Sequence, residues 1–238
     1  MAWLVEKNYH IPGPNFEITA NPGNLKLINN MGICTHLPWE PVAEPVVARQ
    51  IEAYRGKIDD MEIVAGSVAV SQRFRDMVEE FEPGVHAFSP IILERKNGEQ
   101  FEEDYWLWTT QQDIDCLITD NNPKNFRYIP GFEPEEKRIL CSLYQPGREV
   151  PISLPQIEGR HLWTAGLLGL TQLFVSDAFM EAMRRTLRGR IRDERRCIDI
   201  DKPWTAEEQM GPLLSRHRAY VASGRTKVDL TLGEIWAS

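Results

Sequence analysis

The sequence lacks a long hydrophobic run, a secretion signal and any closely spaced pair of cysteines. Its longest apolar stretch, residues 165–175, is interrupted by glycines and polar side chains and falls far short of the roughly 20 residues that span a bilayer. The N-terminus has neither the basic segment nor the long apolar core of a signal peptide. We therefore expect a cytoplasmic protein that does not enter a membrane, with reduced thiols rather than a disulfide scaffold. Its cysteines are Cys34, Cys116, Cys141 and Cys197.

Basic charge is also scarce. The 238 residues include 27 lysines and arginines against 35 aspartates and glutamates, which gives a formal net charge of −8. Nucleic acids and anionic membranes attract proteins with a basic field, so we expect this protein to bind neither. Residues 51–120 contain 16 acidic and six basic side chains, a net charge of −10, whereas the rest of the chain sums to +2. An electrostatic partner should therefore be basic and should meet residues 51–120.

None of the common catalytic motifs is present: there is no Walker loop, GxGxxG, HExxH or GxSxG. Two pairs of residues remain as candidates for chemistry. Cys34 and His36 would share one face of a strand, as a nucleophile pair or half of a zinc site requires. Asp113 and Asp115 would do the same, as in some magnesium sites. The first pair has no second pair of ligands nearby, and in so acidic a region the two aspartates are expected to form a solvated face, so we expect no metal, no cofactor and no catalytic residue. An enzyme with its site near these pairs is kept as an alternative.

The clearest structural unit begins with an apolar, β-branched segment over residues 63–70, which predicts a buried strand. Ser71 follows as a helix N-cap, because its hydroxyl can accept a hydrogen bond from a free N–H of the first turn. The apolar spacing over residues 74–81 predicts an amphipathic helix, which the Pro-Gly pair at 83–84 ends.

Two further strands are predicted to form a hairpin after this helix. They cover residues 86–94 and 101–109, and Asn97-Gly98 between them predicts a type I′ turn. Antiparallel hairpins combined with Ser-capped amphipathic helices indicate an α+β fold.

The strand–helix pattern recurs 105 residues later, where Ser176 corresponds to Ser71 and Phe179 to Phe74. Two similar β-α-β units produced by duplication explain this correspondence. A second explanation is that any capped amphipathic helix between two strands needs these residue types. Both explanations stay open at this point.

Three regions follow from these patterns. Residues 1–60 are rich in proline and are expected to form a β/loop region packed on the main domain, with a short helix over residues 46–54. Residues 61–200 form the main α+β domain. Residues 201–238 form a C-terminal helical extension, which the capping box from Thr205 to Glu208 opens.

The first helix carries its charges in the order that the helix dipole disfavours. Arg73 and Arg75 stand at its start and Glu79, Glu80 and Glu82 near its end, at a cost of roughly 0.3–1 kcal/mol per exposed charge. Stability does not explain this order, so we expect an acidic docking surface for a basic protein partner, with acidity for solubility as the alternative. The expected contact residues are Glu79, Glu80, Glu82, Glu102, Glu103, Asp104, Trp106, Asp113 and Asp115.

Four short strings resemble a known family. They are VSQRF from Val70, EPGVHAFSP from Glu82, and GRHLW from Gly159 followed by FVSDAF from Phe174. In this order they look like the immunity protein 11 domain of bacterial polymorphic toxin systems, over roughly residues 61–200. Thr164 departs from the pattern, because a basic residue is expected after the tryptophan. The first fifty residues and the tail after Asp201 lie outside the resemblance.

The resemblance implies a non-catalytic antitoxin that binds a cognate toxin domain stoichiometrically and occludes its active site. It supplies no catalytic residues, and the residues of its motif are expected to be structural. A self-associating scaffold, seen as a homodimer without a toxin partner, is a further alternative. The structural motif residues are Ser71, Gly84, His86, His161, Trp163 and Ser176.

Overall fold

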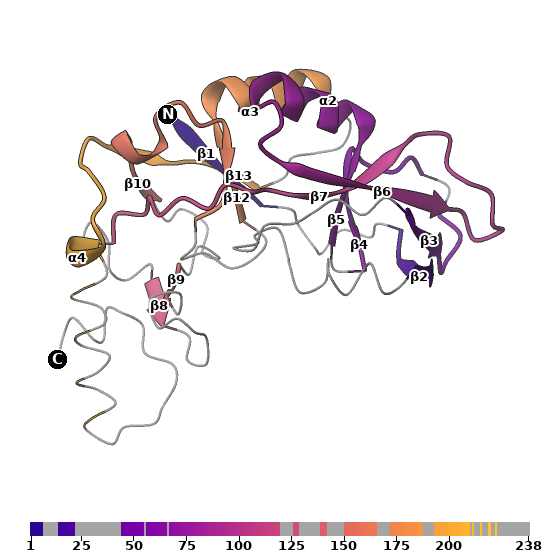
Figure 1. Cartoon of the computed structure of the whole chain (residues 1–238), viewed down its shortest axis with the longest axis horizontal. Helices are drawn as coiled ribbons and strands as arrows, with labels where there is room; N and C mark the ends of the chain where they lie inside the picture. The colour runs from indigo at the N-terminus through magenta and orange to yellow at the C-terminus, as the bar shows by residue number, and fades with distance from the viewer. Residues whose placement is uncertain are drawn as a thin grey trace.

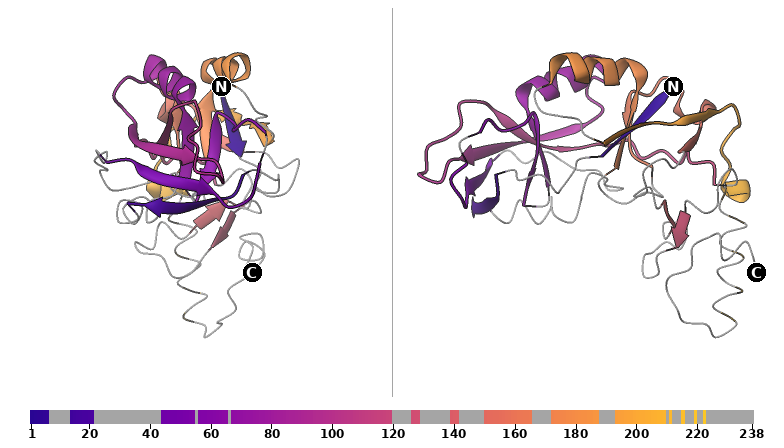
Figure 2. Two further views of the ribbon diagram at one scale, coloured as in Figure 1. Left: turned by 90° about the vertical axis from the view of Figure 1, so that its right-hand side faces the viewer. Right: turned by 180° about the vertical axis from the view of Figure 1, so that it is seen from behind.

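A computed structural model describes residues 1–6, 14–21, 44–54, 56–65, 67–119, 126–128, 139–141, 150–165, 172–187 and 193–209, with residues 211, 215, 219 and 222. In this part of the chain two sheets lie beside each other, and two helices run side by side along one side of both (Figure 1, Figure 2). Most strand pairs are antiparallel, so the predicted α+β class is confirmed. None of the described helices has the length and apolar character to cross a membrane.

The larger sheet has six strands, and only β3 and β6 in it are parallel. The smaller sheet has four antiparallel strands. In spatial order the six are β2 (Phe16–Ala20), β3 (Val46–Gln50), β6 (Ala87–Glu94), β7 (Tyr105–Thr109), β5 (Ser67–Ser71) and β4 (Met61–Val64), and the four are β11 (Leu162–Trp163), β12 (Gln172–Ser176), β1 (Ala2–Glu6) and β13 (Asp193–Arg196).

Two strand pairs and four helices complete the described structure. The helices that cover the sheets are α2 (Gln72–Phe81) and α3 (Asp177–Thr186). The remaining elements are the parallel pair β10 (Pro151–Ser153) and β14 (Ile198–Ile200), the antiparallel pair β8 (Phe126–Tyr128) and β9 (Ile139–Cys141), the 3-10 helix η3 (Pro155–Ile157) and the short helix α4 (Ala206–Gln209).

Both long helices begin at the predicted serine caps. The backbone N–H of Phe74 donates to Ser71 Oγ at 3.3 Å, and that of Phe179 donates to Ser176 Oγ at 3.2 Å. The two serines have nearly the same backbone angles, φ −69° with ψ 163° and φ −69° with ψ 162°. The third predicted cap is also present, since Glu208 N–H donates to Thr205 Oγ1 at the start of α4.

One apolar core joins the two sheets under the helices. It contains residues of both sheets, such as Val70 and Val175, together with the apolar faces of α2 and α3. At its centre the ring of Phe179 makes edge-to-face contacts with Phe74, at 6.4 Å between centroids, and with Phe81, at 5.2 Å. The two sheets are therefore not independent domains in their packing.

The predicted repeat extends to the order of the strands. The run β4-β5-β7-β6 in one sheet corresponds to β11-β12-β1-β13 in the other, with α2 following β5 and α3 following β12. The strand beside each capping strand is β7 in the first unit, where it follows the helix in sequence. In the second unit that strand is β1, which comes from the N-terminus.

Each unit also has a tryptophan at the equivalent position. Trp106 lies opposite Val70 and donates its indole N–H to Gln72 Oε1 at 2.7 Å. Trp3 lies opposite Val175 and donates to Asp177 Oδ1, also at 2.7 Å. An arginine covers each ring: Arg75 lies 3.9 Å from the Trp106 centroid, and Arg184 lies 4.5 Å from that of Trp3. Helix capping and amphipathicity do not require these tryptophans. The two units are therefore more similar than these two requirements alone explain.

The predicted helix over residues 46–54 is wrong, because residues 46–50 form strand β3. Val46, Ala48 and Gln50 are buried while the residues between them are half-buried, which is the period-two pattern of a strand. Strands from the first sixty residues take part in both sheets, since β1 lies between β12 and β13 and β3 pairs with β6.

Two local predictions in the first unit also need correction. The segment predicted as one strand over residues 63–70 is part of a hairpin of β4 and β5, with Ala65 at φ 48° between them. The turn at Asn97-Gly98 is not type I′, because only Gly98 has a positive φ. Gly98 N–H donates to the Arg95 carbonyl at 2.9 Å, as in a type I turn followed by a left-handed glycine.

Phe179→Ala should lower the free energy of unfolding by about 3–5 kcal/mol, because it removes the ring that packs on both Phe74 and Phe81. Urea unfolding followed by circular dichroism and by tryptophan fluorescence measures this. The two signals should shift together, since the units share a core. Phe101→Ala, which truncates a half-buried ring at 6.5 Å from Phe16, is the control and should cost less. Two separate transitions in the Phe179 variant would contradict the shared core.

Candidate functional site

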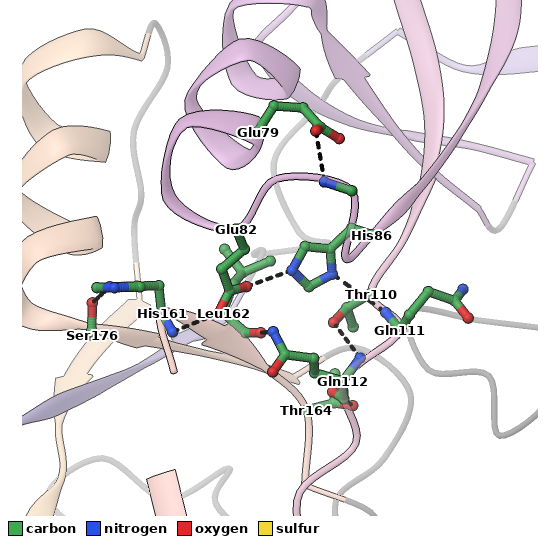
Figure 3. A network of polar contacts seen from close by, with 11 residues as sticks. Glu79, Glu82, His86, Thr110, Gln111, Gln112, His161, Leu162, Thr164 and Ser176 are labelled. Atoms are coloured by element: carbon green, nitrogen blue, oxygen red, sulfur yellow. Dashed lines mark hydrogen bonds and ion pairs between the residues drawn. The ribbon is translucent and has the colours of Figure 1, made fainter. Parts of the chain in front are cut away.

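Two of the motif residues, His86 and His161, contact a buried carboxylate, Glu82, at the C-terminal end of α2 (Figure 3). Glu82 is 6 % exposed. Its Oε2 lies 2.6 Å from His86 Nε2, and its Oε1 accepts the backbone N–H of His161 at 2.7 Å. Glu82 and His86 belong to the first unit and His161 immediately precedes β11 of the second. One side chain therefore bonds the two units directly.

His86 is held on both sides of its ring. The backbone N–H of Gln111 donates to His86 Nδ1 at 3.3 Å, so this nitrogen acts as an acceptor. The ring proton is then on Nε2, where it donates to Glu82 Oε2. The His86 side chain is fully buried, so its two ring nitrogens serve the interior of the protein.

Gln112 and Thr164 extend the network into the second unit. Gln112 Nε2 donates to the carbonyl of Leu162 at 3.2 Å, and the backbone N–H of Thr164 donates to the Gln112 carbonyl at 2.9 Å. Thr164 Oγ1 donates to the same carbonyl at 3.2 Å and the residue is 1 % exposed. Threonine therefore fits this buried position, where its backbone and its hydroxyl both contact Gln112.

The capping serines each have a second polar partner. Ser176 Oγ lies 2.9 Å from His161 Nδ1, and the His161 ring packs edge-on against Phe81 with 5.0 Å between centroids. Ser71 Oγ donates to Asp60 Oδ1 at 2.6 Å, where Asp60 is 1 % exposed. Ser176, His161 and Glu82 therefore lie close together, as a serine, a histidine and an acidic residue do in many hydrolases.

The arrangement around His161 is nevertheless structural. Glu82 contacts the backbone N–H of His161 and not its ring, and among the described residues no carboxylate orients the imidazole as a catalytic triad requires. Ser176 Oγ accepts the first-turn N–H of α3, which fixes it as a helix cap. Trp163 is fully buried and stacks on Phe174 at 5.7 Å between centroids. His161, Ser176 and Trp163 are therefore engaged in the hydrogen bonding and packing of the second unit.

Two opposing effects act on the carboxyl group of Glu82. Burial raises its pKa, but hydrogen bonds from His86, from the backbone of His161 and from Gln112 lower it by more. The net result is a pKa below the ordinary value of 4.5. Glu82 is therefore a carboxylate at neutral pH.

The acidic end of α2 thus has a structural cause. Glu79 Oε2 accepts the backbone N–H of Gly84 at 2.9 Å, in a turn where Gly84 has φ 69°. Glu82 is buried in the network and does not belong to an exposed docking surface, which corrects its place among the expected contact residues. Glu80 is exposed on α2.

The other expected contact residues divide into separate places. Glu102, Glu103 and Asp104 are exposed between β6 and β7, and Trp106 is half-buried beneath Arg75. Asp113 and Asp115 lie apart from them, in the chain that continues beyond β7. Asp113 pairs with Thr164 in an isolated bridge, with 3.4 Å between Thr164 Oγ1 and Asp113 Oδ1.

The described residues show no metal site at these carboxylates or elsewhere: no three histidine, cysteine or acidic side chains gather there to hold an ion. Cys34 and His36 lie outside the described residues. Cys116 and Cys197 are free and buried, and burial raises the pKa of Cys116 to about 12 and that of Cys197 well above its ordinary value. Both are therefore protonated, poorly nucleophilic thiols at neutral pH.

Four polar partners were not singled out from the sequence. They are Asp60, which bonds the capping Ser71, and Thr110, Gln111 and Gln112, which belong to the network around Glu82. Thr110 Oγ1 accepts the backbone N–H of Gln112 at 3.3 Å. Three of the four are uncharged and follow β7 directly, and such residues are common at strand ends. Only Asp60 could have been noticed from the sequence, because an acidic residue directly before an apolar strand is a candidate for a buried polar contact.

Taken together, the fold and the network define an α+β protein of two similar sheet-and-helix units, whose distinctive polar residues join the units. The chain belongs to the immunity protein family (Imm11), whose model matches residues 2–195. The match confirms the family resemblance and extends it to β1, in keeping with the position of that strand inside the second unit. No curated protein matches the chain.

Glu82→Gln should lower the free energy of unfolding at pH 7 by about 1–3 kcal/mol, because a buried charge-assisted contact is weakened. The lowered pKa means that Glu82 stabilises the native protein above pH 4.5 and that this stabilisation is lost as the pH falls through the native pKa. The variant should therefore lose less stability than the wild type on acidification.

Urea unfolding between pH 7 and pH 3 measures both effects. Glu80→Gln is the matched control: it changes an exposed glutamate on the same helix, so its stability should stay within about 0.5 kcal/mol of the wild type. Equal acid sensitivity of the wild type and Glu82→Gln would show that Glu82 does not couple protonation to folding.

Proposed function

We propose that the protein is a non-catalytic inhibitor that binds one cognate toxin domain in a fixed ratio and covers its active site. Membership of the immunity protein family carries this proposal. The structure supports it through the use of the motif residues, since the side chains of His86, His161 and Ser176 are engaged in hydrogen bonds within the protein. On this account the partner is recognised by exposed residues, in the cytoplasm of the producing cell or its kin.

The exposed acidic residues around α2 are the proposed contact surface for a basic toxin. The Asp104 carbonyl accepts the backbone N–H of Gln72 at 3.0 Å, and Gln72 Nε2 donates to Asp76 Oδ1 at 2.6 Å. Glu80 follows Asp76 by one helical turn. Asp104, Asp76 and Glu80 therefore form a continuous acidic ridge along α2, to which Glu102 and Glu103 are adjacent in sequence. Long-range attraction to such a ridge favours association with a basic surface.

Expression of the toxin candidate encoded beside this gene tests the proposal. Cells should survive the toxin domain only when this protein is also present, and the two proteins should co-purify in a fixed ratio. Their affinity should fall as salt is added, because contacts between exposed charges are screened. Glu102→Lys with Asp104→Lys should weaken binding by about ten-fold or more, whereas Glu17→Lys with Glu52→Lys, an equal charge change at exposed residues elsewhere, should not.

Absence of both rescue and complex would overturn the inhibitor role. Binding that is insensitive to salt and to the Glu102 and Asp104 changes would retain the role but reject the acidic contact surface. Protection without any stable complex would instead favour an enzyme.

A further inference from the structure

A groove of about 400 Å³ is lined by residues of α2 and α3. Its apolar lining comes from Met77 and Phe81 of α2 and Ala182 of α3. Met77 and Ala182 are each only 5 % exposed and form part of the core below. The groove is therefore a shallow opening onto the apolar layer that joins the two units.

The walls of the groove carry opposite charges. Asp76 and Glu80 line it from α2, and Arg185 lines it from α3. All three side chains belong to exposed residues. Among the ion pairs between described residues none involves Glu80 or Arg185, so both charges are available to a partner. Arg73, at the same groove, is instead paired with the buried Asp60 at 3.5 Å.

We propose that this groove receives a segment of the cognate toxin that presents basic side chains to Asp76 and Glu80 and an apolar side chain to the floor. The inference rests on the proposed function and deepens it. Charge complementarity carries the choice of occupant: the α2 wall belongs to the acidic ridge, and it continues from Asp104 through Gln72 to the groove. An acidic residue of the segment can meet Arg185.

A second copy of this chain fits the groove less well. Each copy has a net charge of −8, so two copies repel each other at long range. A basic segment is attracted to the same field. The apolar floor then supplies burial, and the paired charges at the rim determine the orientation of the segment.

The test compares purified wild type with two double variants, by titration calorimetry against the toxin domain encoded beside this gene. Asp76→Lys with Glu80→Lys reverses the α2 wall and should raise the Kd at least ten-fold. The matched control, Glu17→Lys with Glu52→Lys, makes the same charge change outside the groove and should leave the Kd within two-fold. Urea unfolding of each variant establishes that the fold is retained.

A photo-crosslinking amino acid at Thr186, which lines the groove, reports on the occupant directly. It should crosslink to the toxin domain in the complex, and the same group at Glu17 should not. Crosslinking of Thr186 only to a second copy of this chain would overturn the proposal in favour of self-association.

The outcomes separate this inference from the proposed function. If the wild type neither binds the toxin domain nor protects cells, the proposed function is overturned, and the groove inference, which depends on it, is overturned as well. If the wild type binds and protects, but the groove variant binds as tightly as the control and Thr186 forms no crosslink to the toxin, the groove inference alone is overturned.

Discussion

The contact of Glu82 with both units is the interaction on which the arrangement depends. One carboxylate oxygen bonds the His86 side chain of its own unit, and the other bonds the His161 backbone at the entrance to the second. The contact with His86 is buried and the contact with His161 is partly buried, so loss of the carboxylate would leave polar groups unpaired in or near the interior. The His161 ring in turn contacts the cap of α3, which ties the end of one helix to the start of the other.

The second unit is complete only when the N-terminus closes it. Strand β1 lies between β12 and β13, with Trp3 at the place that Trp106 takes in the first unit. The two helices then lie side by side over a common core, with their outer faces turned away from the sheets (Figure 2). Because both helices are anchored in this core, their backbones do not have to be ordered when a partner binds to their outer faces.

The sequence predicted the local elements well where a local signal exists. Ser71 and Ser176 were identified as caps, and the helices after them followed from their apolar spacing. The strand at Val46 was missed because five residues are too few to separate the two periodicities. The hairpin of β4 and β5 was missed because both strands are buried and apolar. Glu82 read as a surface charge, since nothing in one sequence reveals that His161, 79 residues away, donates to it. The completion of the second unit by β1 is equally non-local.

Amide hydrogen exchange of the wild-type protein, with and without the toxin domain, tests most directly whether the toxin binds at the α2 and α3 face. We expect slower exchange in the presence of toxin along α2, along α3 and in the segment from Glu99 to Asp104. Exchange in the network around Glu82 should be unchanged, because those amides are already hydrogen-bonded within the protein. Protection confined to the opposite end of the molecule, around β10 and β14, would contradict this expectation.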